Sequence, residues 1–404
     1  MEMTHKTSSG GQDVRNADPA FALLLRFCAE AAPGGTPASV IAATAHVEDW
    51  SRFLDLVKRH RVPGIVHAVL QHFCGHVPET VREAVQRHAH AQSRHNLAMA
   101  AATVRLQKLF DRAGINVVFF KGVLLGQRAY GSLGVKHGKD IDFLVAPADL
   151  ERMFALVMQE GYHLSYPPPP LTPAKIEALR ALQMEAVLFD PRTGVQLEPH
   201  WRLTENSRLL PLAPLVAAAG KWDSITGVPI RSLHPDDHFA YLCVHGARSG
   251  WFRLKWLADL HALIATAPPQ ELLRLYAHAE AREAGPSVVL ALGLCRDLFG
   301  LMVPPAIASH VDTRLQRRMR ALCRIILADA DPQFSTRRLL VLPMLHATAY
   351  GAGHVWAEFM RWIVSCQDAL EVPLPRHLYF LYPALRLPLL VRRRWGARTR
   401  SRVG

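Results

Sequence analysis

Residues 117–122 read Val117-Val118-Phe119-Phe120-Lys121-Gly122, an apolar run that ends in a lysine and a glycine. A second run, Asp140-Ile141-Asp142-Phe143-Leu144-Val145, follows after a connection rich in turn residues. Short apolar runs bounded in this way are typical of buried strands. Because alternate side chains of a strand point to the same face, we expect Asp140 and Asp142 to project together. The sequence therefore predicts two strands that hold a carboxylate pair and a Lys-Gly turn.

The chain before this region has apolar residues at three- and four-residue spacing, which predicts helices over 19–30, 46–73 and 77–114. After it, the pattern predicts a helix through Tyr130, a helix over 147–161, and two strands that flank a hairpin turn at 191–194. These elements together predict a small mixed sheet.

Nearly everything beyond residue 208 has a helical pattern, and the predicted helices are 236–247, 254–265, 270–284, 287–298, 313–328 and 354–366. The predicted fold class is α+β, with a small mixed β-sheet core between a helical N-terminal extension and a large helical C-terminal domain. The expected regions are a disordered N-terminus over 1–18, a helical region over 19–114, the core over 115–207 and the helical domain over 208–404.

The composition indicates a globular protein, since half of the 404 residues are hydrophobic and can form a sizeable core. The formal net charge of +13 would attract phosphates, nucleic acid or an anionic membrane surface. The basic residues are dispersed, which disfavours sequence-specific recognition of nucleic acid. Residues 378–391 are apolar but interrupted by Pro383, Arg386 and Pro388, so they predict a packed amphipathic helix, with peripheral membrane contact through the basic C-terminus as the alternative.

The six cysteines include no C-x-x-C pair and are expected to be buried thiols in a reducing compartment. Residues 1–18 contain no apolar segment of signal-peptide length, and no uncharged apolar stretch of about 18 residues follows. The expected location is therefore the cytoplasm, without a transmembrane segment.

The carboxylate pair suits a divalent metal, because Mg²⁺ is commonly held by one or two carboxylates together with substrate phosphates. The best third acid is Glu198 in Val195-Gln196-Leu197-Glu198-Pro199-His200-Trp201. A third acid would allow two metal ions to clamp both oxygens of a phosphoryl displacement. His200 shares the face of Glu198, so its imidazole could orient a carboxylate or a substrate hydroxyl.

Lys121 and Gly122 stand where a strand gives way to a helix, a position at which backbone N–H groups and the helix dipole favour phosphate. Each of these features also has a structural alternative. A D-x-D pair can be two solvated edge residues, a Lys-Gly pair can be an ordinary turn, and a histidine such as His200 can serve the structure alone.

The ordered set of motifs resembles the uncharacterised bacterial nucleotidyltransferase family of the polymerase-beta-like superfamily. The resemblance is carried by Phe120-Lys121-Gly122, Leu125, Tyr130, Asp140 to Val145, Gly161-Tyr162, Glu198-Pro199-His200-Trp201, Leu233 to His238, Leu242 to Gly246, Trp251, Leu254, Trp256, Leu257 and Asp259. It extends over most of the chain.

The resemblance implies that Asp140 and Asp142 are metal ligands, that Glu198 is the third acidic residue, and that Lys121-Gly122 replaces the Gly-Ser turn that cradles the triphosphate in relatives. Lys136 stands where the family usually has arginine, which keeps the charge but loses bidentate phosphate geometry.

His245 and Asp259 lie on successive predicted helices that the family keeps near its cleft. Either residue could orient or deprotonate an acceptor hydroxyl, or could simply pack between helices.

The expected function is transfer of a nucleoside monophosphate from an NTP such as ATP, with two Mg²⁺ ions and release of pyrophosphate. The family implies a small molecule, a sugar or a peptide as acceptor. Two alternatives stay open: metal-dependent glycosyl transfer from a nucleotide-sugar, and a non-catalytic nucleotide-binding scaffold.

Overall fold

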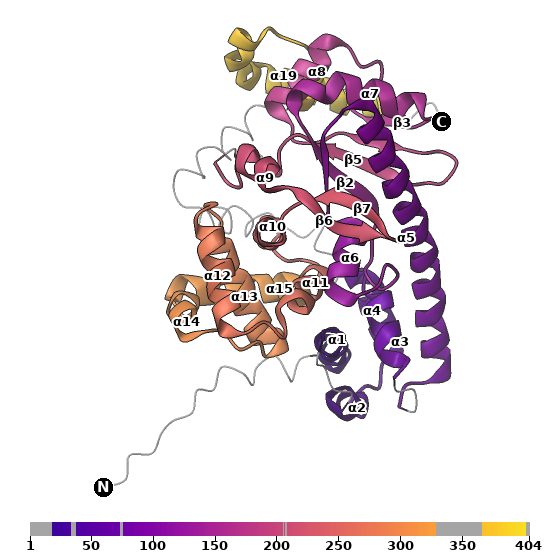
Figure 1. Cartoon of the computed structure of the whole chain (residues 1–404), viewed down its shortest axis with the longest axis vertical. Helices are drawn as coiled ribbons and strands as arrows, with labels where there is room; N and C mark the ends of the chain where they lie inside the picture. Colours follow the sequence, from indigo (N-terminus) through magenta and orange to yellow (C-terminus); the bar gives the residue numbers. More distant parts are fainter. Residues whose placement is uncertain are drawn as a thin grey trace. The chain divides into compact units, whose positions relative to one another are not determined.

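The computed structural model describes residues 18–33, 38–72, 76–204, 206, 208–328 and 366–400, with the backbone alone for 393–400. The chain divides into two compact units, each assembled from segments that lie far apart in the sequence (Figure 1). The first unit comprises Met1–Ala101, Lys121–Lys139 and Pro235–Ala349, and the second comprises Ala102–Phe120, Asp140–His234 and Tyr350–Gly404. The division into four consecutive regions stays a prediction.

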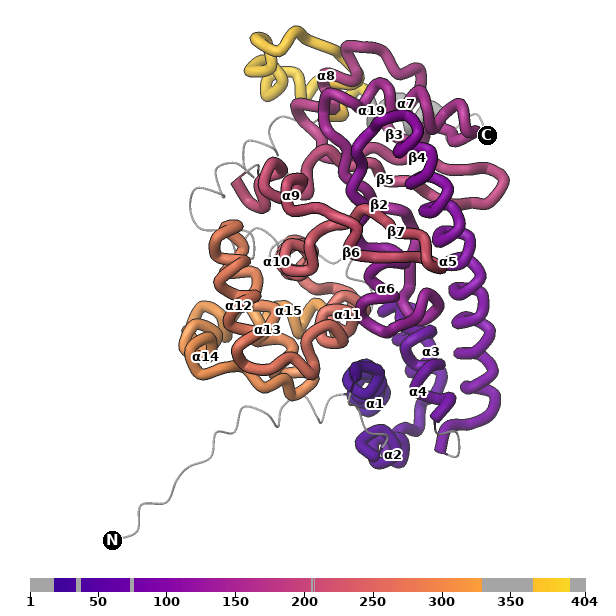
Figure 2. The backbone as a smooth tube through the Cα atoms, in the orientation of Figure 1, coloured from indigo at the N-terminus to yellow at the C-terminus, as the bar shows by residue number. Residues whose placement is uncertain are grey.

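The second unit is built on one mixed sheet of seven strands (Figures 1 and 2). The strands are β1 (Val117–Phe120), β2 (Asp140–Val145), β3 (His163–Tyr166), β4 (Val187–Phe189), β5 (Gln196–His200), β6 (Gly220–Ile225) and β7 (Val228–Ser232). Their order across the sheet is β3-β4-β5-β2-β1-β7-β6. β2 pairs antiparallel with β1 and parallel with β5, so the expected mixed sheet is confirmed.

The two faces of β2 have different roles. Phe143 points to the face covered by the end of helix α5 (Glu79–Ala113), where its ring centroid lies 5.3 Å from Phe110 and 5.6 Å from Phe119. These three buried aromatic rings form an apolar core between the sheet and the end of α5. Asp142 precedes Phe143 in the strand and therefore projects from the opposite face.

Besides the end of α5, the other described elements of the second unit are helical. They are η1 (Pro147–Asp149), α7 (Leu150–Gln159), α8 (Pro173–Leu182), α9 (Leu212–Ala218), α18 (Cys366–Glu371), η2 (Arg376–Leu381) and α19 (Tyr382–Arg400).

The C-terminal elements pack against α8 through a small apolar cluster that contains Ala178, Ala369 and Tyr382. The Tyr382 hydroxyl donates a hydrogen bond to the Val372 carbonyl, which fixes the start of α19. The expected packing is therefore confirmed for this face, while Leu387 on the same helix is 73% exposed. Membrane contact through the exposed face stays a prediction.

The first unit is helical in its described residues. Its elements are α1 (Pro19–Glu30), α2 (Ala38–Thr44), α3 (Trp50–His60), α4 (Pro63–Leu70), the first part of α5, α6 (Gly122–Tyr130), α10 (Pro235–Arg248), α11 (Leu254–Ile264), α12 (Pro269–Glu280), α13 (Gly285–Phe299), α14 (Pro305–Val311) and α15 (Arg314–Ala328). Most of these helices follow the predicted ranges closely. The predicted helix over 354–366 and the disordered segment over 1–18 lie outside the described residues, apart from Cys366 and Asp18.

The segment 131–139, which leads from α6 to β2, is fixed within the first unit. The Asn96 amide donates to the carbonyls of Leu133 and Lys136, both at 2.7 Å, and the Gln92 amide donates to the Gly138 carbonyl at 2.9 Å. Both amide side chains are buried. Their hydrogen bonds therefore satisfy backbone carbonyls that have lost contact with water.

The helical prediction beyond residue 208 is wrong for residues 220–232, which form the hairpin β6–β7. The turn residues Thr226 and Gly227 have φ values of 48° and 79°. A two-residue turn with positive φ at both positions matches the twist of antiparallel strands, and the Thr-Gly pair between β-branched residues was the available signal. Strand β3 and helix α8 were also not predicted.

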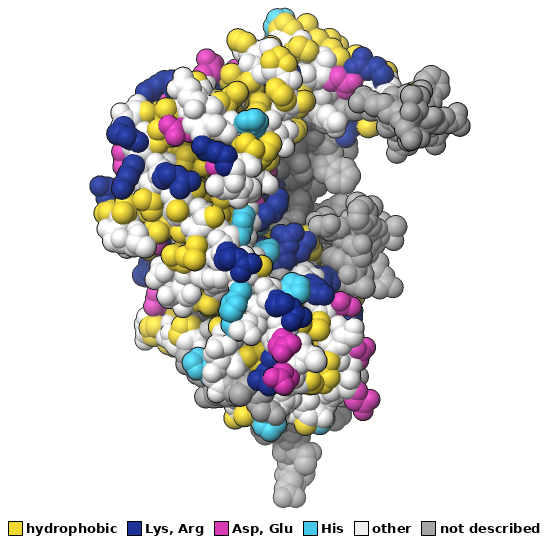
Figure 3. Space-filling view, turned by 90° about the vertical axis from the view of Figure 1, so that its right-hand side faces the viewer, with side chains coloured by type: hydrophobic (Ala, Val, Ile, Leu, Met, Phe, Trp, Pro, Cys, Tyr) yellow, Lys and Arg dark blue, Asp and Glu magenta, His cyan; other side chains and the backbone are white. Residues whose placement is uncertain are grey.

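On the described surface, the basic side chains are interspersed with side chains of other types. Figure 3 shows Lys and Arg side chains spread over one face, with acidic and hydrophobic side chains between them. The five described cysteines are buried free thiols, as expected: Cys28, Cys243, Cys295, Cys323 and Cys366. Among the described helices, none combines the length and the apolar character that a membrane span requires.

Candidate metal centre

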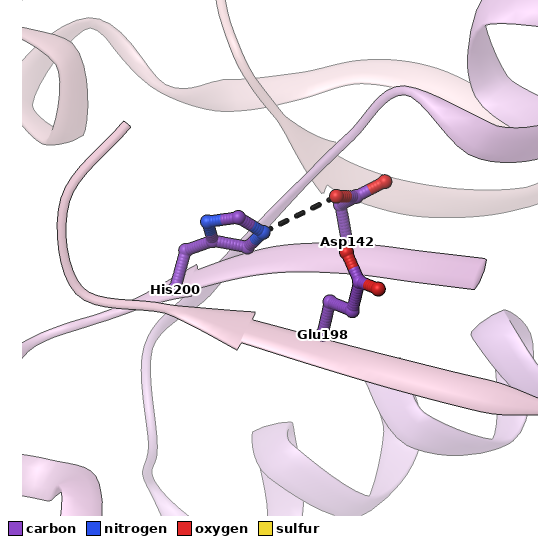
Figure 4. A group of neighbouring side chains, drawn as sticks. All are labelled: Asp142, Glu198 and His200. Atoms are coloured by element: carbon purple, nitrogen blue, oxygen red, sulfur yellow. Dashed lines mark hydrogen bonds and ion pairs between the residues drawn. The ribbon is translucent and has the colours of Figure 1, made fainter. Parts of the chain in front are cut away.

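Strands β2 and β5 bring three ligand-type side chains together in the second unit. The parallel register pairs Asp142 with Glu198 and Leu144 with His200. Since Glu198 and His200 are two residues apart, both project from the face that carries Asp142. One oxygen or nitrogen atom from each of Asp142, Glu198 and His200 lies within 4.8 Å of the others (Figure 4).

The imidazole of His200 lies between two carboxylates. Its Nε2 atom is 3.2 Å from Oδ1 of Asp142, and its Nδ1 atom is 3.3 Å from Oε2 of Glu185. The ring centroid of Phe120 is 5.1 Å away in an edge-on arrangement. His200 is 2% exposed and Asp142 is 1% exposed, so both side chains have lost nearly all contact with water.

Glu198 is half-buried, so this carboxylate keeps some access to solvent. The Gln196 amide donates a 2.6 Å hydrogen bond to its Oε1 atom. Sequence reasoning missed Gln196 as a supporting residue. Its position two residues before Glu198, on the same strand face, was the available signal.

Asp140 is the first residue of β2 and pairs with Gln196. Within the described ranges, the group of ligand atoms that lie within 4.8 Å of one another contains Asp142, Glu198 and His200, and Asp140 is outside it. Strand alternation fixes the face of a side chain but not its distance from the next strand. A metal-binding role for Asp140 stays a prediction.

Lys121 and Gly122 belong to the first unit and open helix α6, as predicted. Lys121 is the N-cap residue with φ 58° and ψ −144°, and it makes no side-chain cap hydrogen bond. Its Nζ atom lies 5.2 Å from the ring centroid of Tyr241, a distance typical of a cation–π contact. The first N–H groups of a helix are suited to an anion, and phosphate binding here stays a prediction.

Lys136, the expected arginine substitute, is 7% exposed in the first unit. Its Nζ atom lies 3.9 Å from Oδ2 of Asp259, whose Oδ1 accepts a 3.0 Å hydrogen bond from the Tyr130 hydroxyl. Burial raises the pKa of Asp259, and the charges of Lys136 and Lys255 oppose that rise. In this structure the three side chains form a buried structural cluster, and phosphate binding by Lys136 stays a prediction.

His245 lies on α10 and is half-buried among aromatic rings. Its ring centroid is 5.8 Å from Tyr241 and 5.2 Å from Trp256. These contacts orient the imidazole on a partly exposed aromatic surface. Contact with a substrate stays a prediction.

The donor set of Asp142, Glu198 and His200 fits a divalent cation. Two carboxylate groups could offset the charge of the ion, and the imidazole brings a nitrogen donor close to them. The three donor atoms lie within 4.8 Å of one another, so they could converge on a single ion. A mixed sheet that presents such a set from adjacent strands defines a candidate metal-dependent enzyme.

The chain belongs to the uncharacterised nucleotidyltransferase family, whose family model matches residues 46–300. The match includes all three residues of the candidate metal centre. Family membership supports nucleotidyl transfer as the general activity. None of the curated proteins compared with the chain matches it.

Proposed function

We propose that this protein transfers a nucleoside monophosphate from an NTP to a hydroxyl or similar group, with a divalent cation such as Mg²⁺ and release of pyrophosphate. The observation that carries the proposal is the convergence of Asp142, Glu198 and His200 in a chain that belongs to a nucleotidyltransferase family. The proposed acceptor is a small molecule, a sugar or a peptide. The D-x-D motif of β2 with a third acid on β5 also supports placement in the polymerase-beta-like superfamily.

Asp142 and Glu198 would hold the cation, and Asp140 would contribute a carboxylate to a second one. A bound cation supplies neutralising charge for the phosphate oxygens and for the leaving pyrophosphate. Gln196 holds Glu198 in place through its 2.6 Å hydrogen bond. The hydrogen bond between His200 and Asp142 would limit rotation of that carboxylate.

Lys121 and Gly122 would bind the triphosphate through the lysine charge and the first N–H groups of α6. Lys136 would add positive charge, and His245 would contact the acceptor from the aromatic surface of α10. Phosphoryl transfer depends chiefly on positioning and charge neutralisation, so no covalent nucleophile from the chain is required.

The proposal is tested by incubating the purified protein with Mg²⁺, each of four α-labelled NTPs and a panel of acceptors. Transfer of label to an acceptor, with matching release of pyrophosphate, is the expected result. Asp142→Asn should abolish it. The matched control is Asp149→Asn, because Asp149 pairs with Arg152 in the same unit and is outside the metal centre.

Two other outcomes reject the proposal. Transfer of sugar from a nucleotide-sugar without transfer of NMP indicates glycosyl transfer through the same metal centre. Tight nucleotide binding without any turnover indicates a scaffold.

A further inference from the structure

We propose that His200 is itself a metal ligand, held in its ligating form by Glu185, and that the centre therefore binds Mn²⁺ in clear preference to Mg²⁺. The inference rests on the metal centre of the proposed function but not on nucleotide transfer. Its test accordingly measures binding of the metal ion alone.

The donor atoms of His200 and Asp142 have nearly the spacing of two neighbouring ligands of one ion. Two ligand atoms about 2.1 Å from an octahedral ion and adjacent to each other lie about 3.0 Å apart. Nε2 of His200 and Oδ1 of Asp142 are 3.2 Å apart, which is close to that separation. The pair makes a hydrogen bond in this structure, and one ion that bound both atoms would take the place of that bond.

The second ring nitrogen of His200, Nδ1, faces Glu185. Nδ1 of His200 is buried and lies 3.3 Å from Oε2 of Glu185, although the geometry falls short of a hydrogen bond. The side chain of Glu185 is 31% exposed and can move to complete the bond. A carboxylate that accepts from one ring nitrogen fixes the proton there and leaves the lone pair of the other nitrogen for a metal.

The backbone holds this arrangement in place. Glu185 forms an isolated antiparallel bridge with His200. On either side of it, the Ala186 N–H donates to the Pro199 carbonyl and the Trp201 N–H donates to the Met184 carbonyl. Glu185 is thus a positioning residue that acts on the ion through His200.

The nitrogen ligand decides the expected selectivity. Mg²⁺ strongly prefers oxygen ligands and loses its water reluctantly, whereas first-row transition ions accept imidazole readily. Replacing one oxygen of the ligand set by Nε2 should therefore favour Mn²⁺. An all-oxygen site formed by Asp142 and Glu198 would lack this preference.

The experiment uses the full-length protein and Mn²⁺ without nucleotide. Pulsed electron paramagnetic resonance detects coupling between bound Mn²⁺ and the ¹⁴N nucleus of a coordinated imidazole, and calorimetry gives the affinities for Mn²⁺ and Mg²⁺. The wild-type protein should show the ¹⁴N coupling. His200→Gln should lose it and should lose most of the preference for Mn²⁺.

Glu185→Gln should retain the ¹⁴N coupling but bind Mn²⁺ about 10-fold more weakly, as expected for loss of a carboxylate that orients a histidine ligand. Glu177→Gln, a change at an exposed glutamate of α8, is the matched control and should leave both affinities unchanged. Bound Mn²⁺ without ¹⁴N coupling, or no Mn²⁺ binding by the folded wild-type protein, overturns the inference. Metal binding as proposed without NMP transfer would leave this inference intact and reject the proposed function alone.

Discussion

Two buried aspartates of this protein, Asp142 and Asp259, are each 1% exposed but have different surroundings. Asp259, in the helical first unit, faces the Lys136 ammonium at 3.9 Å and accepts a hydrogen bond from Tyr130. Asp142, in the sheet of the second unit, lies with a second carboxylate and an imidazole within 4.8 Å.

The comparison shows that burial alone does not identify a functional carboxylate. A buried charge needs compensation, and at Asp259 the chain supplies a cation and a hydroxyl donor. Asp142 lies beside two further ligand-type side chains, one of them the half-buried Glu198, and such a set is suited to an ion from solution. The same Asp-to-Asn change should therefore lower catalytic activity at Asp142 and conformational stability at Asp259.

The largest expected effect is that of Asp142→Asn on catalysis. Loss of one charged ligand should lower the rate of NMP transfer by about 1,000-fold or more, because metal stabilisation of the transition state contributes several kcal/mol. Initial rates of label transfer at saturating NTP measure the effect. A variant that keeps its rate within about 10-fold of wild type would place the catalytic metal elsewhere.

Asp259→Asn should act on stability instead. It leaves the Lys136 ammonium buried without its charge partner, and the free energy of unfolding should fall by about 3 kcal/mol, as for other broken buried pairs. Urea unfolding measures this change. Mn²⁺ binding by the folded variant should stay within about 2-fold of wild type, and a stable variant with impaired metal binding would remove the contrast between the two aspartates.

A double-mutant cycle measures how much the interaction between Lys136 and Asp259 contributes to stability. Lys136→Met should also destabilise the protein, and the combination of Lys136→Met with Asp259→Asn should cost less than the sum of the two changes. The expected coupling free energy is on the order of 1 kcal/mol, since the two charged groups are close but not in direct hydrogen-bond contact. If the two changes in the free energy of unfolding are fully additive, the interaction between Lys136 and Asp259 contributes nothing to stability.

The smallest effect concerns a third carboxylate, Asp190, in the turn between β4 and β5. Hydrogen bonds from the exposed Arg192 lower the pKa of Asp190 to about 2. Because this pKa is below the ordinary aspartate value of about 3.9, the contribution of Asp190 to stability is complete above pH about 4. It should be lost as the pH falls towards 2.

Asp190→Asn should therefore lower the free energy of unfolding by on the order of 1 kcal/mol at pH 5, with the difference from wild type shrinking at lower pH. Unfolding curves recorded in steps between pH 5 and pH 2 test the prediction. A difference that is constant over this range would assign the effect to packing rather than to the charge.

Much of the sheet could be predicted from local sequence. The alternation in Asp140 to Val145 matches β2, and Pro191 to Gly194 does connect the antiparallel strands β4 and β5. The hairpin β6–β7 was missed because its apolar residues have no clear period, and only the Thr226-Gly227 turn distinguishes it from a helix.

The candidate site was predictable in part. Strand alternation predicted that Glu198 and His200 share one face, but the parallel register that brings them beside Asp142 is a long-range contact without a local signal. The contact of Glu185 with His200 depends on how two strand segments meet. The Lys136–Asp259 pair joins residues more than 120 positions apart in the sequence, and single-residue patterns do not encode such pairings.

The most direct test of the central claim is a crystal structure of the protein with Mn²⁺ and a non-hydrolysable NTP analogue, recorded with anomalous diffraction. We predict an anomalous peak about 2.2 Å from a carboxylate oxygen of both Asp142 and Glu198, which is the usual ligand distance for such ions. A Mn²⁺ ion bound to the nucleotide phosphates but beyond coordinating distance of these two residues would contradict the account.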